Sequence, residues 1–178
     1  MMADEIKIDA GTRMFNEGDP AGYLYNAGSF GNTVDFNPGS GTYNLTSFGQ
    51  SDSYIQKLDL NGNFQWARQM GGGLNQCFCG LVLDAAGNIY CAGYSYGTAD
   101  FNPDPAGTYY LTSEGGNDVM VYSSDPAGNF RWVEQMGGTG MDFGISLALD
   151  ASGNIFTTGA FQSAADFDPS GNATANLT

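Results

Sequence analysis

Histidine is absent from this 178-residue sequence, and basic residues are rare: five Lys and Arg stand against 19 Asp and Glu. Without histidine, the chain has no imidazole for acid–base catalysis or for a histidine metal site. The net charge of −14 opposes binding to nucleic acid or to an anionic membrane, so neither is expected as a partner. No apolar run is long enough to span a membrane. The acidic first residues do not resemble a signal peptide, which indicates a cytoplasmic protein or a mature or shortened form of an exported one.

Glycine and aromatic residues are abundant instead: the chain holds 27 Gly, 12 Phe and 10 Tyr, and its apolar fraction is 42%. That fraction is too high for a disordered chain. Short apolar runs separated by glycine-containing turns, without a long helical period, are typical of an all-β protein. The length allows one sizeable core.

The sequence repeats itself at a fixed offset of 66 residues. Residues 59–103 laid over residues 125–169 without a gap are identical at 21 of 45 positions. Gln69-Met-Gly-Gly, for example, returns as Gln135-Met-Gly-Gly. A fixed period of this length is the mark of a repeat architecture.

Five turns of the form Asp-x-x-Gly divide the chain, and each is flanked by strand-like runs. The aspartate can cap the turn through its side chain, and glycine takes the backbone conformation with positive φ. Each turn predicts a β-hairpin, and the alternating spacing of 40, 25, 41 and 25 residues predicts two kinds of hairpin in each repeat. The turns begin at Asp19, Asp59, Asp84, Asp125 and Asp150.

Two hairpins give four strands per repeat, expected in the second repeat near 77–83, 88–96, 118–123 and 129–135. Repeated sheets of four antiparallel strands are the blades of a β-propeller. The sequence thus predicts an all-β protein of propeller-like blades, about two and a half in this chain. The expected divisions are an N-terminal strand at 1–11, a first blade at 12–70, a second blade at 71–136 and a partial third blade at 137–178.

An insertion separates the second and third strands of each predicted blade. It begins Asp-Phe-Asn-Pro or Asp-Phe-Asp-Pro and, in the first two copies, continues through Gly-Thr-Tyr-x-Leu-Thr-Ser. This is long for a hairpin loop. We expect the Leu-Thr-Ser part to form a short extra strand or an ordered flap.

These motifs recur in register: the Asp-x-x-Gly-Asn turns between strands, the Phe-x-Trp segments at Phe64 and Phe130, and the Asp-Phe-Asp-Pro…Leu-Thr-Ser insertions. In these features, the region from about residue 19 to residue 178 resembles the SBBP-type β-propeller repeats of bacteria. The resemblance implies a propeller fold, a secreted or cell-surface location, and a binding or scaffolding role without general enzyme activity. No catalytic residue is carried over, and we expect no enzyme.

Cysteine occurs only at Cys77, Cys79 and Cys91, all in the second repeat. Two interpretations stay open. Cys77 and Cys79 alternate with Leu81 on what we expect to be the inward face of a strand, where they would be small apolar side chains. Alternatively, Cys79 and Cys91 form a disulfide between neighbouring strands. Three thiols alone lack the fourth ligand of a structural zinc site.

The third predicted blade contains only its first hairpin, which leaves a strand edge open to association. Near the N-terminus, Ile6 and Ile8 alternate with polar residues, as the third strand of a blade should. We expect this segment of one subunit to complete the third blade of a neighbour by strand addition, which gives a ring or a filament. The alternatives are a shortened chain and an N-terminal strand that folds back within its own chain. The expected interface residues are Asp4, Ile6, Ile8, Phe161 and Leu177.

Carboxylate and amide oxygens alternate along the three insertions. Calcium prefers several oxygen ligands, although the spacing lacks the length, the central glycine and the closing glutamate of an EF-hand loop. Two interpretations follow: a calcium site, or turns in which the side chains cap backbone N–H groups. No other cofactor is expected. The candidate ligands are Asp35, Asn37, Asp100, Asn102, Asp104, Asp166 and Asp168.

Two classes of function are consistent with these features. The favoured one is an extracellular structural protein that assembles with itself. The alternative is a module that binds a carbohydrate or a protein partner in adhesion, with the tyrosines of the insertions as its recognition surface. Trp66 and Trp132 occupy equivalent repeat positions and are expected in the core. The candidate ligand-binding residues are Tyr43, Tyr109 and Tyr110.

Overall fold

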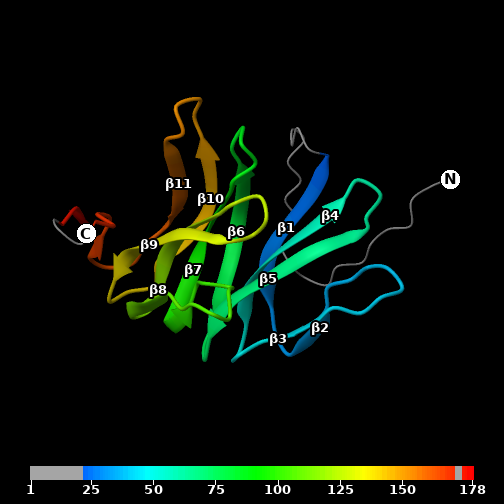
Figure 1. Ribbon diagram of the computed structural model, residues 1–178. Helices are drawn as coiled ribbons and strands as arrows, with labels where there is room; N and C mark the ends of the chain where they lie inside the picture. Colours follow the sequence, from blue (N-terminus) through cyan, green and yellow to red (C-terminus); the bar gives the residue numbers. More distant parts are fainter. Residues whose placement is uncertain (1–21, 171–173) are drawn as a thin grey trace.

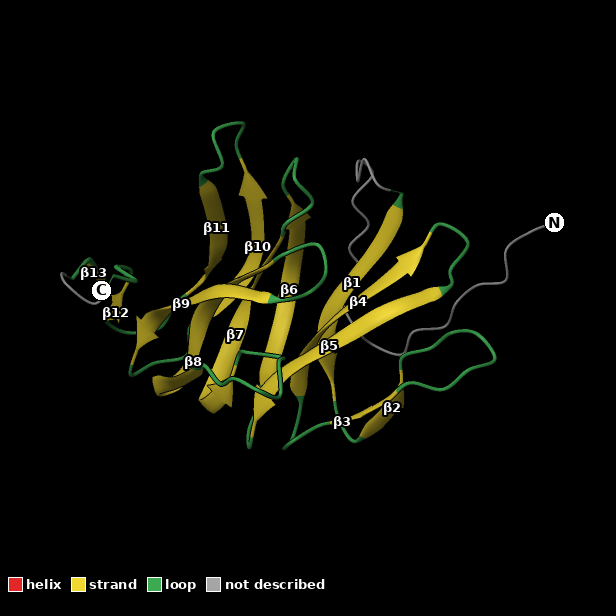
Figure 2. Ribbon diagram, viewed as in Figure 1, coloured by secondary structure: helices red, strands yellow, loops and turns green. Residues whose placement is uncertain are grey.

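The structure of the protein, a computed structural model, describes residues 22–170 and 174–178. These residues form strands and turns but no helix (Figures 1 and 2), which confirms the predicted all-β class. The expected strand at 1–11 and the turn at Asp19 lie outside the described residues. The strands are β1 (Tyr23–Phe30), β2 (Thr33–Asp35), β3 (Asn44–Thr46), β4 (Asp52–Asp59), β5 (Phe64–Gly72), β6 (Gln76–Leu83), β7 (Ile89–Asp100), β8 (Tyr110–Ser124), β9 (Phe130–Gly138), β10 (Phe143–Leu149), β11 (Ile155–Ala160), β12 (Ala165–Asp166) and β13 (Asn176–Leu177).

The four strands predicted for the second repeat are present as one antiparallel sheet in the order β6-β7-β8-β9. β7 and β8 extend beyond the prediction because they continue into the insertion, where Ala99 pairs with Leu111 and Asp100 with Tyr110. The short pairs β2–β3 and β12–β13 are the corresponding insertion hairpins. The expected extra strand of the insertion is therefore confirmed.

Before this sheet, β1, β4 and β5 pair in the same antiparallel order. The turn from β4 to β5 shows why the Asp-x-x-Gly motif forms hairpins. Asp59 Oδ1 accepts the N–H groups of Asn61 and Asn63 at 2.8 and 2.9 Å, and Gly62 has a φ of 82°. The turns at Asp84, Asp125 and Asp150 have the same hydrogen bonds.

Each sheet is joined to the next by two residue pairs at equivalent repeat positions. Gly71 and Gly72 at the end of β5 pair with Asp100 and Ala99 of β7, and 66 residues later β9 pairs with β12 in the same way. A Cβ atom at Gly72 would lie 2.1 Å from the carbonyl oxygen of Thr98, so the Gly-Gly pair permits this close backbone approach. These pairings join nine strands into one open sheet, whereas β2–β3 and β10–β11 form separate two-stranded sheets, and no sheet closes on itself among the described residues.

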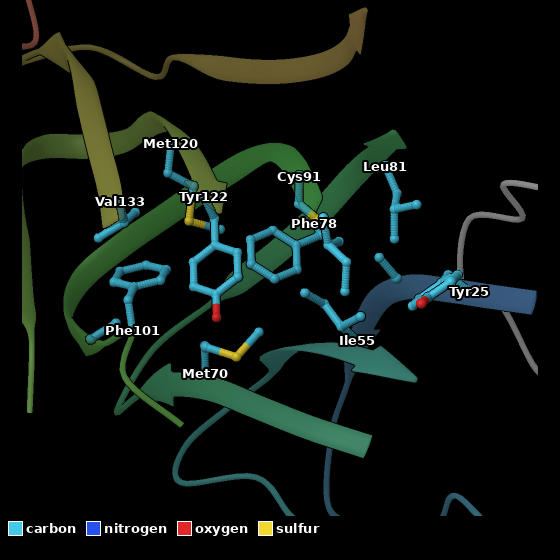
Figure 3. Packing of buried hydrophobic residues seen from close by; sticks show 13 residues of the cluster. Tyr25, Ile55, Met70, Phe78, Leu81, Cys91, Phe101, Met120, Tyr122 and Val133 are labelled. Carbon is cyan, nitrogen blue, oxygen red and sulfur yellow. The ribbon is translucent and has the colours of Figure 1, made fainter. Parts of the chain in front are cut away.

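The main core lies between the first two sheets. β4 and β5 contribute Ile55 and Met70, which face Phe78, Tyr122 and Met120 of the second sheet (Figure 3). These five side chains are at most 1% exposed, and the rings of Phe78 and Tyr122 lie 5.3 Å apart. The sheets therefore stack face to face through apolar side chains.

The cysteines contradict the sequence-based expectation. A bulge between Phe78 and Gly80 adds one residue to β6, so that Phe78 and Leu81 face the core while Cys77 and Cys79 are half-buried. The inward alternation predicted for Cys77, Cys79 and Leu81 is wrong because one inserted residue inverts the alternation of faces. The Cys79–Cys91 disulfide is also absent: all three thiols are free, and Leu81 stands opposite Cys91.

Candidate functional site

The hairpin of β10 and β11 has an open edge. β11 pairs with β10 from Ile155 to Ala160, and within residues 22–170 and 174–178 no strand pairs with its other edge. β10 packs against β6 and β7 of the second sheet, and β6 packs against β1 and β4 of the first (Figure 1). β10 also carries a bulge between Gly144 and Ser146, at the repeat position of the bulge in β6. The hairpin thus has the form of the first half of the second-repeat sheet.

In the second repeat, the same edge is covered by β8. Met120 of β8 stands opposite Gly93, and Tyr122 stands opposite Cys91. Both side chains are buried between the first two sheets (Figure 3). β8 therefore covers the edge of β7 and contributes two large side chains to the packing between consecutive sheets.

An apolar cavity of about 240 Å³ lies beside β11 in the place that corresponds to Met120 and Tyr122. Gly159 and Thr157 line it, at the repeat positions of Gly93 and Cys91. Gly144 also lines it, where the preceding repeat has the ring of Phe78. The apolar side chains that line the cavity are those of Met136, Phe143, Phe161, Phe167 and Leu177.

Two of the five expected interface residues lie at this cavity. Phe161 is 39% exposed and Leu177 is 53% exposed, and the ring of Phe161 lies 5.3 Å from that of Phe167. The structure therefore brings together these two residues, which are far apart in sequence, beside the open edge. Asp4, Ile6 and Ile8 lie outside the described residues.

A pair of buried carboxyl groups was missed by the sequence reasoning. Asp52 is the first residue of β4, Asp118 lies within β8 at the equivalent repeat position, and both are at most 1% exposed. Asp118 Oδ2 accepts the amide of Gln135 at 2.7 Å, and Asp52 Oδ2 accepts that of Gln69 at 2.6 Å. Burial raises the pKa of both, to about 6 for Asp118. The recurrence of Asp and Gln at an offset of 66 was the pattern that could have identified them.

The candidate calcium ligands lie in three separate turns. In the second insertion, Asp100 Oδ1 accepts the N–H groups of Asn102 and Tyr109 at 3.0 and 2.8 Å. Asn102 and Asp104 each accept the N–H two residues on. The turns with Asp35 and Asn37 and with Asp166 and Asp168 have the same hydrogen bonds.

These contacts favour the capping interpretation, since one oxygen of each side chain already accepts backbone hydrogen bonds. The described residues contain no group of three or more His, Cys, Asp or Glu side chains placed to hold a metal. Calcium binding stays a prediction. If calcium binds the folded state, it raises the melting temperature.

Two of the three candidate ligand-binding tyrosines stack on strand residues. Tyr43 lies 4.7 Å from Phe64 between ring centroids, and Tyr109 lies 5.0 Å from Phe130. Tyr110 has its side chain in solvent and is 63% exposed. The first two therefore anchor the insertions against their sheets, whereas Tyr110 is available for contact.

The fold defines the class of the protein. Antiparallel sheets of short strands that recur along the chain and stack face to face are the parts of a β-propeller-type repeat protein. The family model of the SBBP β-propeller repeat matches residues 65–102, as the sequence resemblance indicated. That match runs from β5 through β6 and β7 into the insertion, and so includes the junction between consecutive sheets.

A second comparison agrees with this class. The chain is 28% identical over 135 residues to an uncharacterized WD repeat-containing protein of Acanthamoeba polyphaga mimivirus, and the aligned part covers 72% of this chain. WD repeats build β-propellers. The chain spans about a tenth of the length of that relative. No helix able to cross a membrane occurs in the part of the chain that the structure describes.

Proposed function

We propose that the protein is a non-enzymatic, extracellular structural module that assembles with itself by strand addition at β11. In this proposal, each 66-residue unit is one propeller blade, and β10–β11 is the first half of a third blade. The occupant of the open edge is the segment 4–9 of a second copy. The observation that carries the proposal is the apolar cavity beside an unpaired strand edge, which the preceding repeat fills with Met120 and Tyr122 of β8.

The register of the added strand follows from the repeat. Within β8, Asp118 is followed by Met120 and Tyr122, whose side chains enter the core. The segment 4–9 has the same order of an aspartate followed by apolar residues two and four positions later. Aligned on that aspartate, Ile6 stands opposite Gly159 and Ile8 opposite Thr157. Both side chains then enter the cavity, because alternate residues of a strand share one face.

Strand addition gives two kinds of stabilisation. Backbone hydrogen bonds along β11 supply affinity, and the cavity selects apolar side chains at alternate positions. Because the donor segment and the receiving edge are different surfaces, the contact is heterologous and propagates into a ring or a filament. The charge of −14 on every copy opposes this contact, so association strengthens as salt screens the charges.

The test is the double substitution Ile6→Lys and Ile8→Lys in the whole chain. Two ammonium groups do not enter an apolar cavity without a large desolvation cost. We expect size-exclusion chromatography with light scattering to show oligomers for the unaltered chain and monomers for the variant. The matched control is Lys7→Gln, whose side chain points away from the cavity in this register and which keeps the oligomers.

A complementation experiment separates this contact from other modes of association. Leu177→Asp damages the receiving cavity but leaves the donor segment intact, whereas the Ile6/Ile8 variant retains its receiving cavity. Each variant alone is monomeric, and an equimolar mixture gives dimers that grow no further. A monomeric unaltered chain, or variants that assemble as well alone as together, would overturn the proposal.

A second candidate function rests on Tyr110. Its ring is 63% exposed at the start of β8, and exposed aromatic rings stack on sugars or protein partners. A glycan array of the unaltered protein and of Tyr110→Ala tests this adhesion function. If the protein binds carbohydrate, the unaltered protein binds at least one glycan and Tyr110→Ala does not. The absence of any bound glycan excludes carbohydrate as the ligand class.

A further inference from the structure

Cys77 and Cys79 depart from the repeat. The next unit has Phe143 and Ile145 at these positions, so the propeller fold itself requires no sulfur here. Both cysteines are half-buried, whereas Cys91 is fully buried. Two partly accessible thiols at positions that break the repeat therefore call for a role other than packing.

The bulge in β6 brings the two sulfur atoms together. Residues two apart in a regular strand have Cα atoms roughly 7 Å apart on one face. The extra residue in β6 bends the strand, and the Cys79 thiol donates to Cys77 Sγ at 3.8 Å. A disulfide has sulfur atoms about 2 Å apart, so a closing movement of about 2 Å joins them.

The surroundings of Cys77 favour its thiolate. The side-chain hydrogen bond from Cys79 lowers the pKa of Cys77, partial burial opposes this, and hydrogen bonds from Ser29 and Tyr94 add to the lowering, so that the pKa is about 6. The pKa of Cys79 is raised, because its proton is held in the hydrogen bond to Cys77, because it is partly buried and because the Cys77 charge is adjacent. Burial and then the charge on Cys77 raise the pKa of Tyr94 to about 12. One thiolate beside one thiol is the arrangement of a nucleophile with a resolving partner.

We propose that Cys77 and Cys79 form a redox-active dithiol site that reduces small-molecule disulfides, with Cys77 as the nucleophile and Cys79 as the resolving thiol. This site is separate from the proposed strand addition at β11.

The reaction has two exchange steps. The Cys77 thiolate attacks one sulfur of the small disulfide, the S–S bond breaks, and one thiolate leaves and takes a proton from water. Cys77 then carries no charge, so the negative charge that raised the pKa of Cys79 is removed. Cys79 loses its proton to water and attacks Cys77 Sγ, which expels the second thiolate. The protein dithiol loses two electrons and becomes a disulfide, and the small disulfide becomes two thiols.

The test uses dithiodipyridine, a neutral disulfide that the acidic protein does not repel, and follows the thiopyridone released by the folded protein. The unaltered chain is expected to release two equivalents and to end with a Cys77–Cys79 disulfide, while Cys91 stays reduced. Cys79→Ser is expected to release one equivalent and to keep a mixed disulfide on Cys77. Cys77→Ser is expected to react about tenfold more slowly. In that variant only Cys79 can attack, and a thiol without a lowered pKa is mostly protonated at pH 7.

Peptide mapping of the unaltered chain by mass spectrometry requires no variant and identifies the bonded pair directly. A mixed disulfide that persists on Cys77 of the unaltered chain would overturn the proposal. Equal reaction rates for Cys77→Ser and Cys79→Ser would overturn it as well.

Discussion

Replacement of Phe78 by alanine is expected to lower the free energy of unfolding by about 3–5 kcal/mol. The Phe78 side chain is fully buried between the first two sheets and packs against Tyr122 with 5.3 Å between ring centroids. Removal of the ring loses its transfer free energy and leaves a cavity that the surrounding strands fill only in part. Figure 3 shows the ring among Tyr122, Cys91 and Ile55. Urea denaturation followed by fluorescence measures the change.

Phe156→Ala is the matched control for this prediction. Phe156 lies on β11 and is 58% exposed, so the loss of its ring is expected to change stability by less than about 0.5 kcal/mol. Equal effects of the two substitutions would mean that the first two sheets do not stack through this core.

Replacement of Asp118 by asparagine is expected to stabilise the protein at pH 7.5 by about 1–3 kcal/mol and to have a smaller effect at pH 4.5. The pKa of Asp118 in the folded protein, about 6, lies above the value of about 3.9 in an unfolded chain. The folded state thus binds this proton more tightly. The stabilisation that protonation of Asp118 gives is complete below about pH 3.9 and is lost as the pH rises through about 6. Asparagine keeps an acceptor for Gln135 without a charge.

The measurement is the free energy of unfolding of both proteins between pH 3 and 8. Between pH 6 and 4 the unaltered protein gains stability, because Asp118 and Asp52 take up protons. Below about pH 4 it loses stability, because hydrogen bonds hold the pKa values of several turn aspartates below their usual range. These residues are Asp35, Asp59, Asp84, Asp125, Asp150 and Asp168. A substitution that destabilises the protein at pH 7.5 more than at pH 4.5 would show that the ionised form of Asp118 is the stabilising one.

Local patterns in the sequence predicted the strands and turns well. Asp59 and Gly62 define a hairpin through hydrogen bonds that span only four residues, so the motif alone was sufficient. The bulge in β6 could not be predicted, because one extra residue changes the face of every later side chain and has no marker in Cys77-Phe-Cys79-Gly80. For that reason, strict alternation predicts an inward face with the cysteines in place of Phe78.

The candidate site was predicted only in part. Repeat counting placed an open edge after the hairpin of β10 and β11, and it selected Phe161 and Leu177. The cavity depends on Gly144, where the preceding repeat has Phe78, and on side chains that meet only in three dimensions. The buried Asp118 was likewise invisible, because aspartate in a sequence usually indicates a turn or an exposed surface.

Hydrogen exchange of the β11 amides, from Ile155 to Ala160, tests the proposed strand addition most directly. Exchange is followed at several concentrations of the unaltered chain and of the Ile6→Lys, Ile8→Lys variant. We expect protection of the β11 amides that face the open edge to rise with concentration in the unaltered chain and not in the variant, while the amides that pair with β10 and those of β7 stay protected in both. Open-edge amides of β11 that exchange equally fast in the two proteins at every concentration would contradict strand addition at this edge.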